Sequence, residues 1–266
     1  MHPMLNIGIR AARNAGNIIA KAYENLDKVE IYSKGANDYV TNVDNAAEAA
    51  IIDTIQKSYP EHGIIAEESG ITDGQNNDYQ WVIDPLDGTT NFIKGIPHFA
   101  VSVALRIKGK TEHGVIYDPL RNELFTASRG GGAQLNGYRL RVSKLRDLNG
   151  AIIGTGFPFK QKHLTETYLK MFQSIFNECS DLRRAGSAAL DLAYVAAARQ
   201  DAFFELGLKP WDMAAGELIA REAGALVTDV AGNYNFMKSG NIVVANPKII
   251  KLILGHFHEH LIDSMK

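Results

Sequence analysis

The sequence predicts a layered protein of mixed α and β structure, in the α+β or α/β class. Three observations support this: an amphipathic helix near the N-terminus, a series of strands separated by tight turns, and a second half in which strands alternate with helices. The pattern changes near residues 146–150, where the chain becomes polar. We therefore expect an N-terminal domain, residues 1–146, and a C-terminal α/β domain, residues 147–266.

The composition excludes several classes of protein. The 266 residues are 45% hydrophobic and 22% charged, which is typical of a soluble globular protein. A net charge of −2 argues against general or specific DNA binding. Cys179 is the only cysteine, which fits a reducing cytoplasm. Arg10 and Arg13 interrupt the N-terminal stretch, so we expect neither a signal peptide nor a membrane segment.

The first elements follow from hydrophobic spacing. Residues 4–23 form a helix whose buried stripe is Leu5, Ile9, Ala12, Ala15, Ile19 and Tyr23. A short strand at 29–33 and a loop at 34–38 precede Thr41, which lies three residues before Asp44 in a capping pattern that begins a second helix. A buried strand at 63–66 ends at Glu67. Residues 69–80 are rich in Asp, Asn and Gly and predict a surface loop.

The next stretch, WVIDPLDGTTNF at residues 81–92, combines a strand with a forced bend. Because Pro85 lacks a backbone donor, we expect strand pairing to end at Asp84. Asp87 and Gly88 form a turn, and Thr89 and Thr90 are placed to cap a short helix whose first N–H groups form an anion site. Alone, this stretch also fits a hairpin whose aspartates only cap turns.

The chain then follows the period of strands and later alternates strands with helices. An antiparallel meander covers residues 99–107, 111–117 and 123–129. The glycines at 130–132 indicate a turn, because no lysine and helix follow as a phosphate loop requires. In the second half we expect strands at 151–155, 181–184, 202–206, 226–228 and 241–245, and helices at 164–176, 187–198, 213–223 and from 248.

Two stretches of the second half are candidates for ligand binding. Arg183 and Arg184 lie just before a helix that begins after Gly186, which suits an anionic or polyhydroxylated ligand. Asp212 lies at another helix start, where an N-cap is the simpler local explanation. His256 and His260 share a helix face, but a metal site there is disfavoured because no further ligand is near in the sequence.

The acidic residues are more informative together than singly. Each lies at a strand end or helix start, where loops from different elements can meet in a cleft: Asp44, Glu67, Asp84, Asp87 and Asp212. Two like charges about 4 Å apart cost about 4 kcal/mol at an effective dielectric near 20. Divalent cations relieve this repulsion, and oxygen ligands without Cys or His favour Mg²⁺. Bound cations would also let the site accept a phosphate dianion.

Three separated motifs resemble those of one known family. They are Glu67-Glu68, the segment DPLDGT at 84–89 and the segment WDMAAG at 211–216, in this order along the chain. They are similar to the signature motifs of the inositol monophosphatase family, within the Mg²⁺-dependent, lithium-sensitive sugar phosphatases. The resemblance runs from end to end and is strongest to bacterial members. It implies an αβαβα sandwich with the active site between the two halves, a homodimer and inhibition by lithium.

The resemblance also implies a role for each matching residue. The metal ligands would be Glu67, Asp84, Asp87, Asp212 and the carbonyl of Leu86, with Asp44 at a third, weaker ion. Thr89 and Glu67 would activate the attacking water, and Asp87 would belong to the same catalytic group. The phosphate would contact Gly88 and Thr89, and the alcohol would contact Glu205, Arg183, Gly186, Ser187 and Ala188, with Leu86, Asp87 and Asp212 close to the substrate.

The expected reaction is hydrolysis of a phosphomonoester with two or three Mg²⁺ ions, by direct attack of a water that the metal activates. Myo-inositol 1-phosphate is the first expected substrate, and fructose 1,6-bisphosphate, NADP and 3′-phosphoadenosine phosphates are alternatives. The resemblance to bacterial members also implies a role in transcription antitermination with RNA polymerase. A mainly non-enzymatic factor in transcription or RNA processing is the alternative of a different class.

Overall fold

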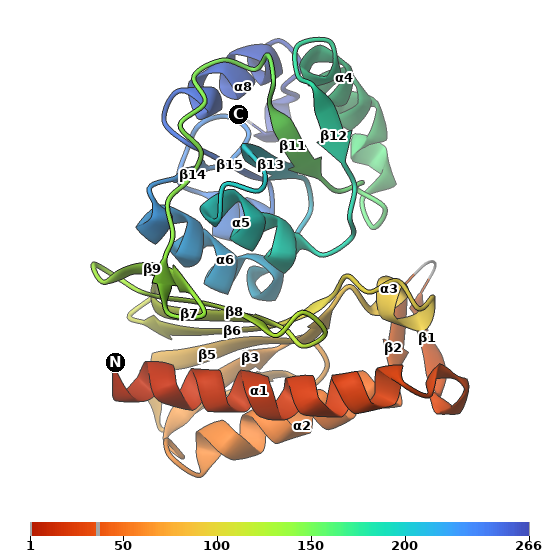
Figure 1. Cartoon of the computed structure of the whole chain (residues 1–266), viewed down its shortest axis with the longest axis vertical. Coiled ribbons are helices and arrows are strands. Elements are labelled where there is room, and N and C mark those ends of the chain that lie inside the picture. Colours follow the sequence, from red (N-terminus) through yellow and green to blue (C-terminus); the bar gives the residue numbers. More distant parts are fainter. Residues whose placement is uncertain (1, 36–37, 266) are drawn as a thin grey trace.

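The computed structural model describes residues 2–35 and 38–265 and arranges them in five layers, in which helices alternate with sheets (Figure 1). The helical layers are α1 (Pro3–Tyr23) with α2 (Asn42–Gln56), α5 (Ala188–Ala196) with α6 (Pro210–Ala223), and α4 (Thr165–Phe176) with α8 (Ile249–His258). One sheet lies on each side of the middle helices. The expected αβαβα sandwich is thereby confirmed.

The two sheets differ in their topology. The larger has the strand order β10 (Tyr138–Arg139), β9 (Gly132–Leu135), β8 (Glu123–Ser128), β7 (Lys110–Asp118), β6 (Ala100–Ile107), β5 (Asn76–Asp87), β3 (His62–Ala66) and β4 (Gly70–Thr72). It is antiparallel except between β3 and β5. The smaller has the order β12 (Asp181–Arg183), β11 (Ile152–Thr155), β13 (Ala202–Glu205), β15 (Ile242–Ala245) and β14 (Leu226–Thr228). In it β11 runs parallel to both of its neighbours.

Three hydrophobic cores fill the spaces between the layers. Neighbouring strand residues point to opposite faces, so Trp81 and Ile83 pack with α1 and α2 while Val82 packs toward α5 and α6. In the smaller sheet Phe203 faces the middle helices and Phe204 faces α4 and α8. Burying each such side chain stabilises the fold by about 1.5–3 kcal/mol. The middle core joins both halves of the chain.

The smaller elements lie at the margins of these layers. Strands β1 (Ile31–Gly35) and β2 (Asp38–Thr41) form a hairpin, and the loop predicted at 34–38 falls partly on residues 36 and 37, outside the described residues. The short helices are α3 (Thr89–Ile93) and α7 (Phe236–Ser239), and the 3₁₀ turns are Leu26–Lys28, Lys162–Leu164 and Asp263–Met265. Within residues 2–35 and 38–265, no helix is both long and apolar enough to cross a membrane.

The start of α2 confirms the predicted capping pattern. Thr41 Oγ1 accepts from the amide of Val43 at 3.1 Å, and Asp44 Oδ2 accepts from the amide of Thr41 at 2.9 Å. This reciprocal box satisfies amides that the first helical turn leaves without helical partners. It also fixes the buried Asp44 carboxylate at the entrance of the helix.

Two predictions about the stretch from 69 to 92 are wrong. The surface loop predicted at 69–80 consists largely of β4 and the start of β5, because ladder hydrogen bonds to β3 and β6 outweigh the turn-forming composition. Strand pairing also does not end at Asp84. Asp84 pairs with Ser102 and Asp87 with Ala100, so a bulge accommodates Pro85 and β5 continues to Asp87.

Two predicted helix starts are also corrected. Helix α6 begins at Pro210 with Lys209 as its N-cap, so Asp212 is the third helical residue and not the cap. Proline suits the first helical position because its missing N–H would have no helical partner there. Gly88 is the N-cap of α3, so neither Thr89 nor Thr90 caps it through a side chain.

The division into domains at residues 146 and 147 stays a prediction. Strand β10 of the larger sheet ends at Arg139, and β11 of the smaller sheet begins at Ile152. Helices α5 and α6 contribute to one core with residues of both sheets. The two halves therefore share their middle layer.

Candidate active site

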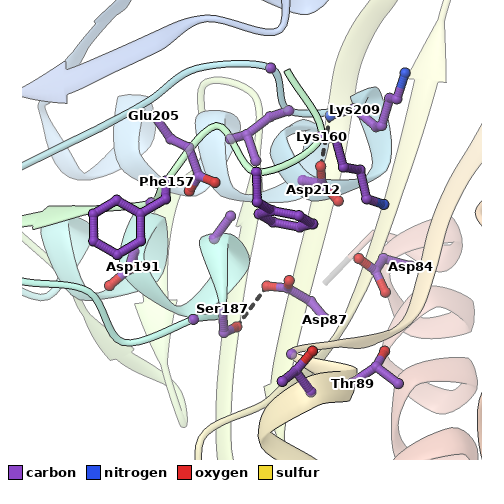
Figure 2. Close-up of a pocket in the computed structure, with 18 of the residues that line it drawn as sticks. Asp84, Asp87, Thr89, Phe157, Lys160, Ser187, Asp191, Glu205, Lys209 and Asp212 are labelled. Carbon is purple, nitrogen blue, oxygen red and sulfur yellow. Dashed lines mark hydrogen bonds between the residues drawn. The ribbon is translucent and has the colours of Figure 1, made fainter. Parts of the chain in front are cut away.

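A cavity of about 500 Å³ lies where the two halves meet, beside the ends of β5, β11 and β13. Four of the five acidic residues singled out in the sequence line this cavity: Glu67, Asp84, Asp87 and Asp212. Asp44 does not line it. Figure 2 shows Asp84, Asp87 and Asp212 directed toward a common space, with Glu205 and Asp191 farther along the wall.

Glu67 and Asp84 are neighbours because β3 and β5 are parallel. Ala66 pairs with Ile83, and the amide of Glu67 donates to the carbonyl of Ile83 at 3.2 Å. Both acidic residues therefore follow directly at the carboxyl ends of adjacent strands. Asp84 is almost fully buried, and its Oδ1 accepts from the amide of Leu86 at 3.0 Å.

The bulge in β5 determines where Asp87 points. In a regular strand, residues three positions apart lie on opposite faces. The additional residue restores Asp87 to the face of Asp84, where its Oδ2 accepts from Ser187 Oγ at 2.6 Å and from the amide of Ala189 at 2.7 Å. These bonds join the end of β5 to the start of α5. Asp87 thus connects the two halves across the cavity.

The start of α6 places Asp212 opposite the strand ends. Asp212 Oδ2 accepts from the amide of Lys209 at 2.7 Å, and Ser102 Oγ donates to the carbonyl of Trp211 at 3.2 Å. Ser102 pairs with Asp84 across β5 and β6. Asp212 is therefore held against the same part of the sheet as Asp84.

Thr89 lies at the start of α3, with Asp44 behind it. Thr89 Oγ1 is 3.0 Å from Asp44 Oδ1 and 3.0 Å from the carbonyl oxygen of Leu86, and its single proton serves one of them at a time. Asp44 also receives hydrogen bonds from Thr41. In this structure Asp44 orients Thr89, and its assignment to a third ion stays a prediction.

Two glycines allow the α3 and α5 loops to approach each other. Gly88 and Gly186 have φ values of 100° and 95°, in the left-handed region that favours glycine. A Cβ on Gly88 would lie 3.3 Å from the carbonyl oxygen of Gly186. Asn91 Nδ2 secures the approach by donating to the carbonyl of Ala185 at 2.9 Å.

The electrostatics of the cluster favour a bound cation. Burial, followed by the charges of Glu67, Asp87 and Asp212, raises the pKa of Asp84 well above its ordinary value. Burial and the charge of Asp87 likewise raise the pKa of Asp212, and burial raises the pKa of Asp87 to about 6. Asp84 and Asp212 are therefore harder to ionise partly because other acids are close. A divalent cation among them would reverse this effect.

The donor set fits Mg²⁺ in its chemistry. Every candidate ligand is an oxygen, from the four carboxylates and the carbonyl of Leu86. The hydrogen bonds described above engage only Oδ1 of Asp84 and Oδ2 of Asp87 and Asp212. Among the described residues, no three His, Cys, Asp or Glu side chains already converge at ligand distances.

The far end of the cavity is built from a second pair of acids. Burial raises the pKa of Asp191 to about 8 and raises that of Glu205 well above its ordinary value. Gln200 Nε2 donates to Asp191 Oδ1 at 2.9 Å. A Cβ added to Gly156, at the end of β11, would overlap the Glu205 carboxyl group. This end can accept hydrogen bonds from the hydroxyls of an alcohol.

The structure brings most of the predicted residues together; the two that do not line the cavity are Asp44, which lies behind Thr89, and Arg183. Leu86, Gly88, Thr89, Gly186, Ser187, Ala188 and Glu205 line the cavity with the acids. Arg183 does not line it and instead pairs with Asp181, whereas Arg184 does line it. Arg183 is the last residue of β12 and Arg184 is the first residue after it, and the sequence contained no signal for which of them faces the cavity.

Sequence reasoning also missed Asp191 and Lys160. Asp191 lies within a helix, where its position alone gives no indication of a role, although a charged residue among the apolar residues of α5 was a detectable signal. Lys160 lies on the irregular segment after β11. Its approach to the site depends on tertiary structure that no local pattern encodes.

The chain is similar to known proteins over its full length. Residues 1–262 match the family model described as "Inositol monophosphatase family". A protein of Escherichia coli (strain K12) named "Nus factor SuhB" is 65% identical over 266 residues, which covers 100% of both chains. The crystal structure of extragenic suppressor protein suhB from Bartonella henselae has a TM-score of 0.95 at 42% identity, covering 98% of this chain and 100% of its own. An inositol monophosphatase from Anabaena has a TM-score of 0.86 at 35% identity, covering 96% and 95%.

Proposed function

Because this chain belongs to the inositol monophosphatase family, we propose that it is a Mg²⁺-dependent phosphatase that hydrolyses myo-inositol 1-phosphate to inositol and phosphate. The observation that carries the proposal is the group of four acids around one cavity, with burial and mutual repulsion raising the pKa of Asp84 and Asp212. An acidic cavity would repel a phosphate dianion unless cations were bound.

Glu67, Asp84, Asp87, Asp212 and the Leu86 carbonyl would hold the Mg²⁺ ions. When bound, Mg²⁺ supplies positive charge against the phosphate and lowers the pKa of water. The amides of Gly88 and Thr89 at the start of α3 would bind phosphate oxygens. Thr89, when its proton points to Asp44 Oδ1, presents oxygen lone pairs that can accept a hydrogen bond from the attacking water. Glu67 would accept the proton of that water.

The alcohol would lie at the far end of the cavity. Glu205 and the turn formed by Gly186, Ser187 and Ala188 line that wall. A cyclitol has several hydroxyl groups, and the carboxyl oxygens of Glu205 and Asp191 can accept hydrogen bonds from them. This complementarity supports an inositol phosphate as the first substrate, ahead of fructose 1,6-bisphosphate, NADP and 3′-phosphoadenosine phosphates.

A phosphate-release screen tests the proposal directly. Purified protein would be incubated with each of these four substrates, with and without Mg²⁺, and with added Li⁺. We expect Mg²⁺-dependent release from myo-inositol 1-phosphate at the highest kcat/KM and inhibition by Li⁺. Higher kcat/KM for another substrate would reassign the specificity, and no release from any of them would refute the phosphatase assignment.

A second function is supported by the likeness to relatives named as Nus factors. Identity of 65% over all 266 residues to such a relative supports the proposal that this chain shares its partner. We therefore propose that it also acts in transcription antitermination with RNA polymerase. Affinity capture of RNA polymerase by the wild type and by Asp87→Asn tests this: binding by both separates the two functions, and binding by neither argues against the second.

We further propose that the protein is a homodimer in the cytoplasm. The homodimer is implied by the family resemblance, and the single cysteine suits a reducing compartment. Light scattering coupled to size-exclusion chromatography would give the mass in solution. A mass near that of one 29.2 kDa chain at all concentrations would contradict the dimer.

A further inference from the structure

Lys160 is a cation on the wall that faces the acidic cluster. It lies on the segment 156–161, which leaves the end of β11 and lines the cavity from the C-terminal half. The other cations that line the cavity are Lys94, Arg184 and Lys209. Figure 2 shows the Lys160 side chain extending into the space beside Asp84 and Asp212, whereas the Lys209 side chain extends away from it.

The charges of Lys160 and Arg184 act on different acids of the cavity. The positive charge of Lys160 lowers the pKa of Asp212, in opposition to the larger effect of burial. Arg184 instead lowers the pKa of Asp87, Asp191 and Glu205, and its guanidinium lies 5.7 Å from the ring centroid of Phe157. Together with its direction in Figure 2, this associates Lys160 with the part of the cavity beside Asp84 and Asp212.

We propose that Lys160 is a further substrate-binding residue, which contacts the phosphate group from the side opposite the amides of Gly88 and Thr89. This inference rests on the proposed phosphatase function and adds a residue to it. The flexible four-carbon stem of a lysine lets its ammonium follow a phosphate oxygen as a point charge. The contact would come from the C-terminal half, whereas Gly88 and Thr89 belong to the N-terminal half.

The same charge has opposite effects on the two ligands of the site. An ammonium near Asp212 repels an incoming divalent cation and attracts a phosphate dianion. Removing it should therefore strengthen Mg²⁺ binding and weaken phosphate binding. A residue that only supports the fold would weaken both. Lys160 Nζ also lies 5.7 Å from the ring centroid of Phe159. Loss of that contact alone would not change the affinities for Mg²⁺ and phosphate in opposite directions.

The experiment compares Lys160→Met and Lys160→Arg with Lys162→Met. Lys162 is a matched control because it is an exposed lysine two positions away, in the turn Lys162–Leu164, and does not line the cavity. Calorimetry would measure Mg²⁺ binding and, at saturating Mg²⁺, the binding of inorganic phosphate. Steady-state kinetics with myo-inositol 1-phosphate would separate KM from kcat.

For Lys160→Met we expect Mg²⁺ to bind about threefold to tenfold more tightly, and phosphate binding to weaken and KM to rise by a similar factor. Lys160→Arg should resemble the wild type, and Lys162→Met should change neither the Mg²⁺ affinity nor the phosphate affinity. Added salt should reduce the differences in affinity between Lys160→Met and the wild type. Unchanged phosphate affinity in Lys160→Met, or weakening of both ligands, would refute the inference. A wild type without Mg²⁺-dependent turnover would instead refute the proposed function, since the two binding measurements do not depend on turnover.

Discussion

Asp87 is hydrogen-bonded to the start of a helix from the other half of the chain. Its Oδ2 accepts from Ser187 Oγ and from the amide of Ala189, so one carboxylate oxygen joins β5 to α5. Oδ1 takes part in neither of these hydrogen bonds and is the oxygen that would bind a cation. One residue therefore positions the halves and contributes charge to the site.

Asp87→Asn should separate these two roles. The amide oxygen of asparagine can still accept both hydrogen bonds, but the charge that would hold Mg²⁺ is lost. We expect phosphate release from myo-inositol 1-phosphate to fall by about a hundredfold or more, with an unchanged circular dichroism spectrum and melting temperature. The exposed Asp78→Asn on the same strand is the control. Retained Mg²⁺-dependent turnover in Asp87→Asn would contradict the metal assignment.

Asp191 makes stability depend on pH. Burial raises its pKa from 3.8 to about 8, so the folded protein holds a proton that the unfolded chain releases. The free energy of unfolding therefore falls as the pH rises across this window. Between about pH 6 and pH 9, unfolding by urea should show that the wild type loses about 2 kcal/mol more than Asp191→Asn.

Asparagine retains the acceptor for Gln200 and carries no charge, so Asp191→Asn is expected to fold. Asp73→Asn, at an exposed position, should behave like the wild type. Equal pH dependence of the wild type and Asp191→Asn would show that Asp191 is already ionised in the folded protein at neutral pH.

Single residues also show how far a sequence can specify a site. Asp84 and Asp87 stand next to Pro85 and Gly88, and Asp212 lies two residues after Pro210, so the bends near these acids were visible in the sequence. The choice between Arg183 and Arg184 was not visible, because it depends on how the chain leaves a three-residue strand at Arg183. Asp212 was correctly predicted to lie at a helix start, but it is the third helical residue and not the N-cap. Lys209 is an uncommon N-cap, and Pro210 in the first turn was the better signal for where the helix begins.

Strand β5 shows where composition is overruled at the scale of an element. Its first residues, Asn76, Asn77 and Asp78, have a turn-like composition and are exposed. They are nevertheless strand, because β3 and β6 lie on both sides and fix the register. Pro85 was expected to end the strand, and it is tolerated because the bulge removes the need for its missing donor. Tertiary pairing decided both cases.

The end of β11 gives a second prediction at this scale. Gly156 has no side chain where the Glu205 carboxyl group lies, and its φ is not in the left-handed region. Gly156→Ala should therefore fold and displace only the end of the Glu205 side chain. We expect kcat/KM for myo-inositol 1-phosphate to fall about tenfold while inhibition by inorganic phosphate is unchanged.

Gly255→Ala is a suitable control, because a Cβ there meets nothing within 4 Å and alanine favours the helix α8. A similar loss of inhibition by inorganic phosphate in Gly156→Ala would mean that the substitution disturbs the phosphate end as well.

At the scale of the whole molecule, the acidic cavity couples metal binding to stability. The raised pKa values of Asp84, Asp212 and Glu205 mean that the folded state loses stability as pH rises and these groups ionise. Mg²⁺ at about 100 times its Kd should add about 2.7 kcal/mol, which corresponds to about 5–10 °C in melting temperature for a chain of this size.

Because Mg²⁺ competes with protons for the carboxylates, the increase in melting temperature at one fixed Mg²⁺ concentration should be larger at about pH 8 than at about pH 6. Thermal unfolding monitored by circular dichroism, with NaCl at matched ionic strength as the control, would measure it. An equal shift with NaCl would show that only general screening is involved.

The layered architecture followed from the sequence because its periods are long and regular. The buried stripe of α1 and the meander of β6 to β8 are local patterns. How the halves meet is not local: the contact of Asp87 with Ser187 joins residues 100 positions apart. Such contacts entered the prediction only through the family resemblance.

The shared middle layer has a consequence for how this protein can diverge. Helices α5 and α6 are covered on both sides by sheets, and α5 includes small buried residues such as Ala189, Ala193 and Ala196. A larger side chain there would push two sheets apart and widen the cavity between them. The outer helices α1, α2, α4 and α8 each keep one face in solvent. Sequence drift among descendants of this chain should therefore be concentrated on the two outer surfaces, while the interior pair of helices changes most slowly.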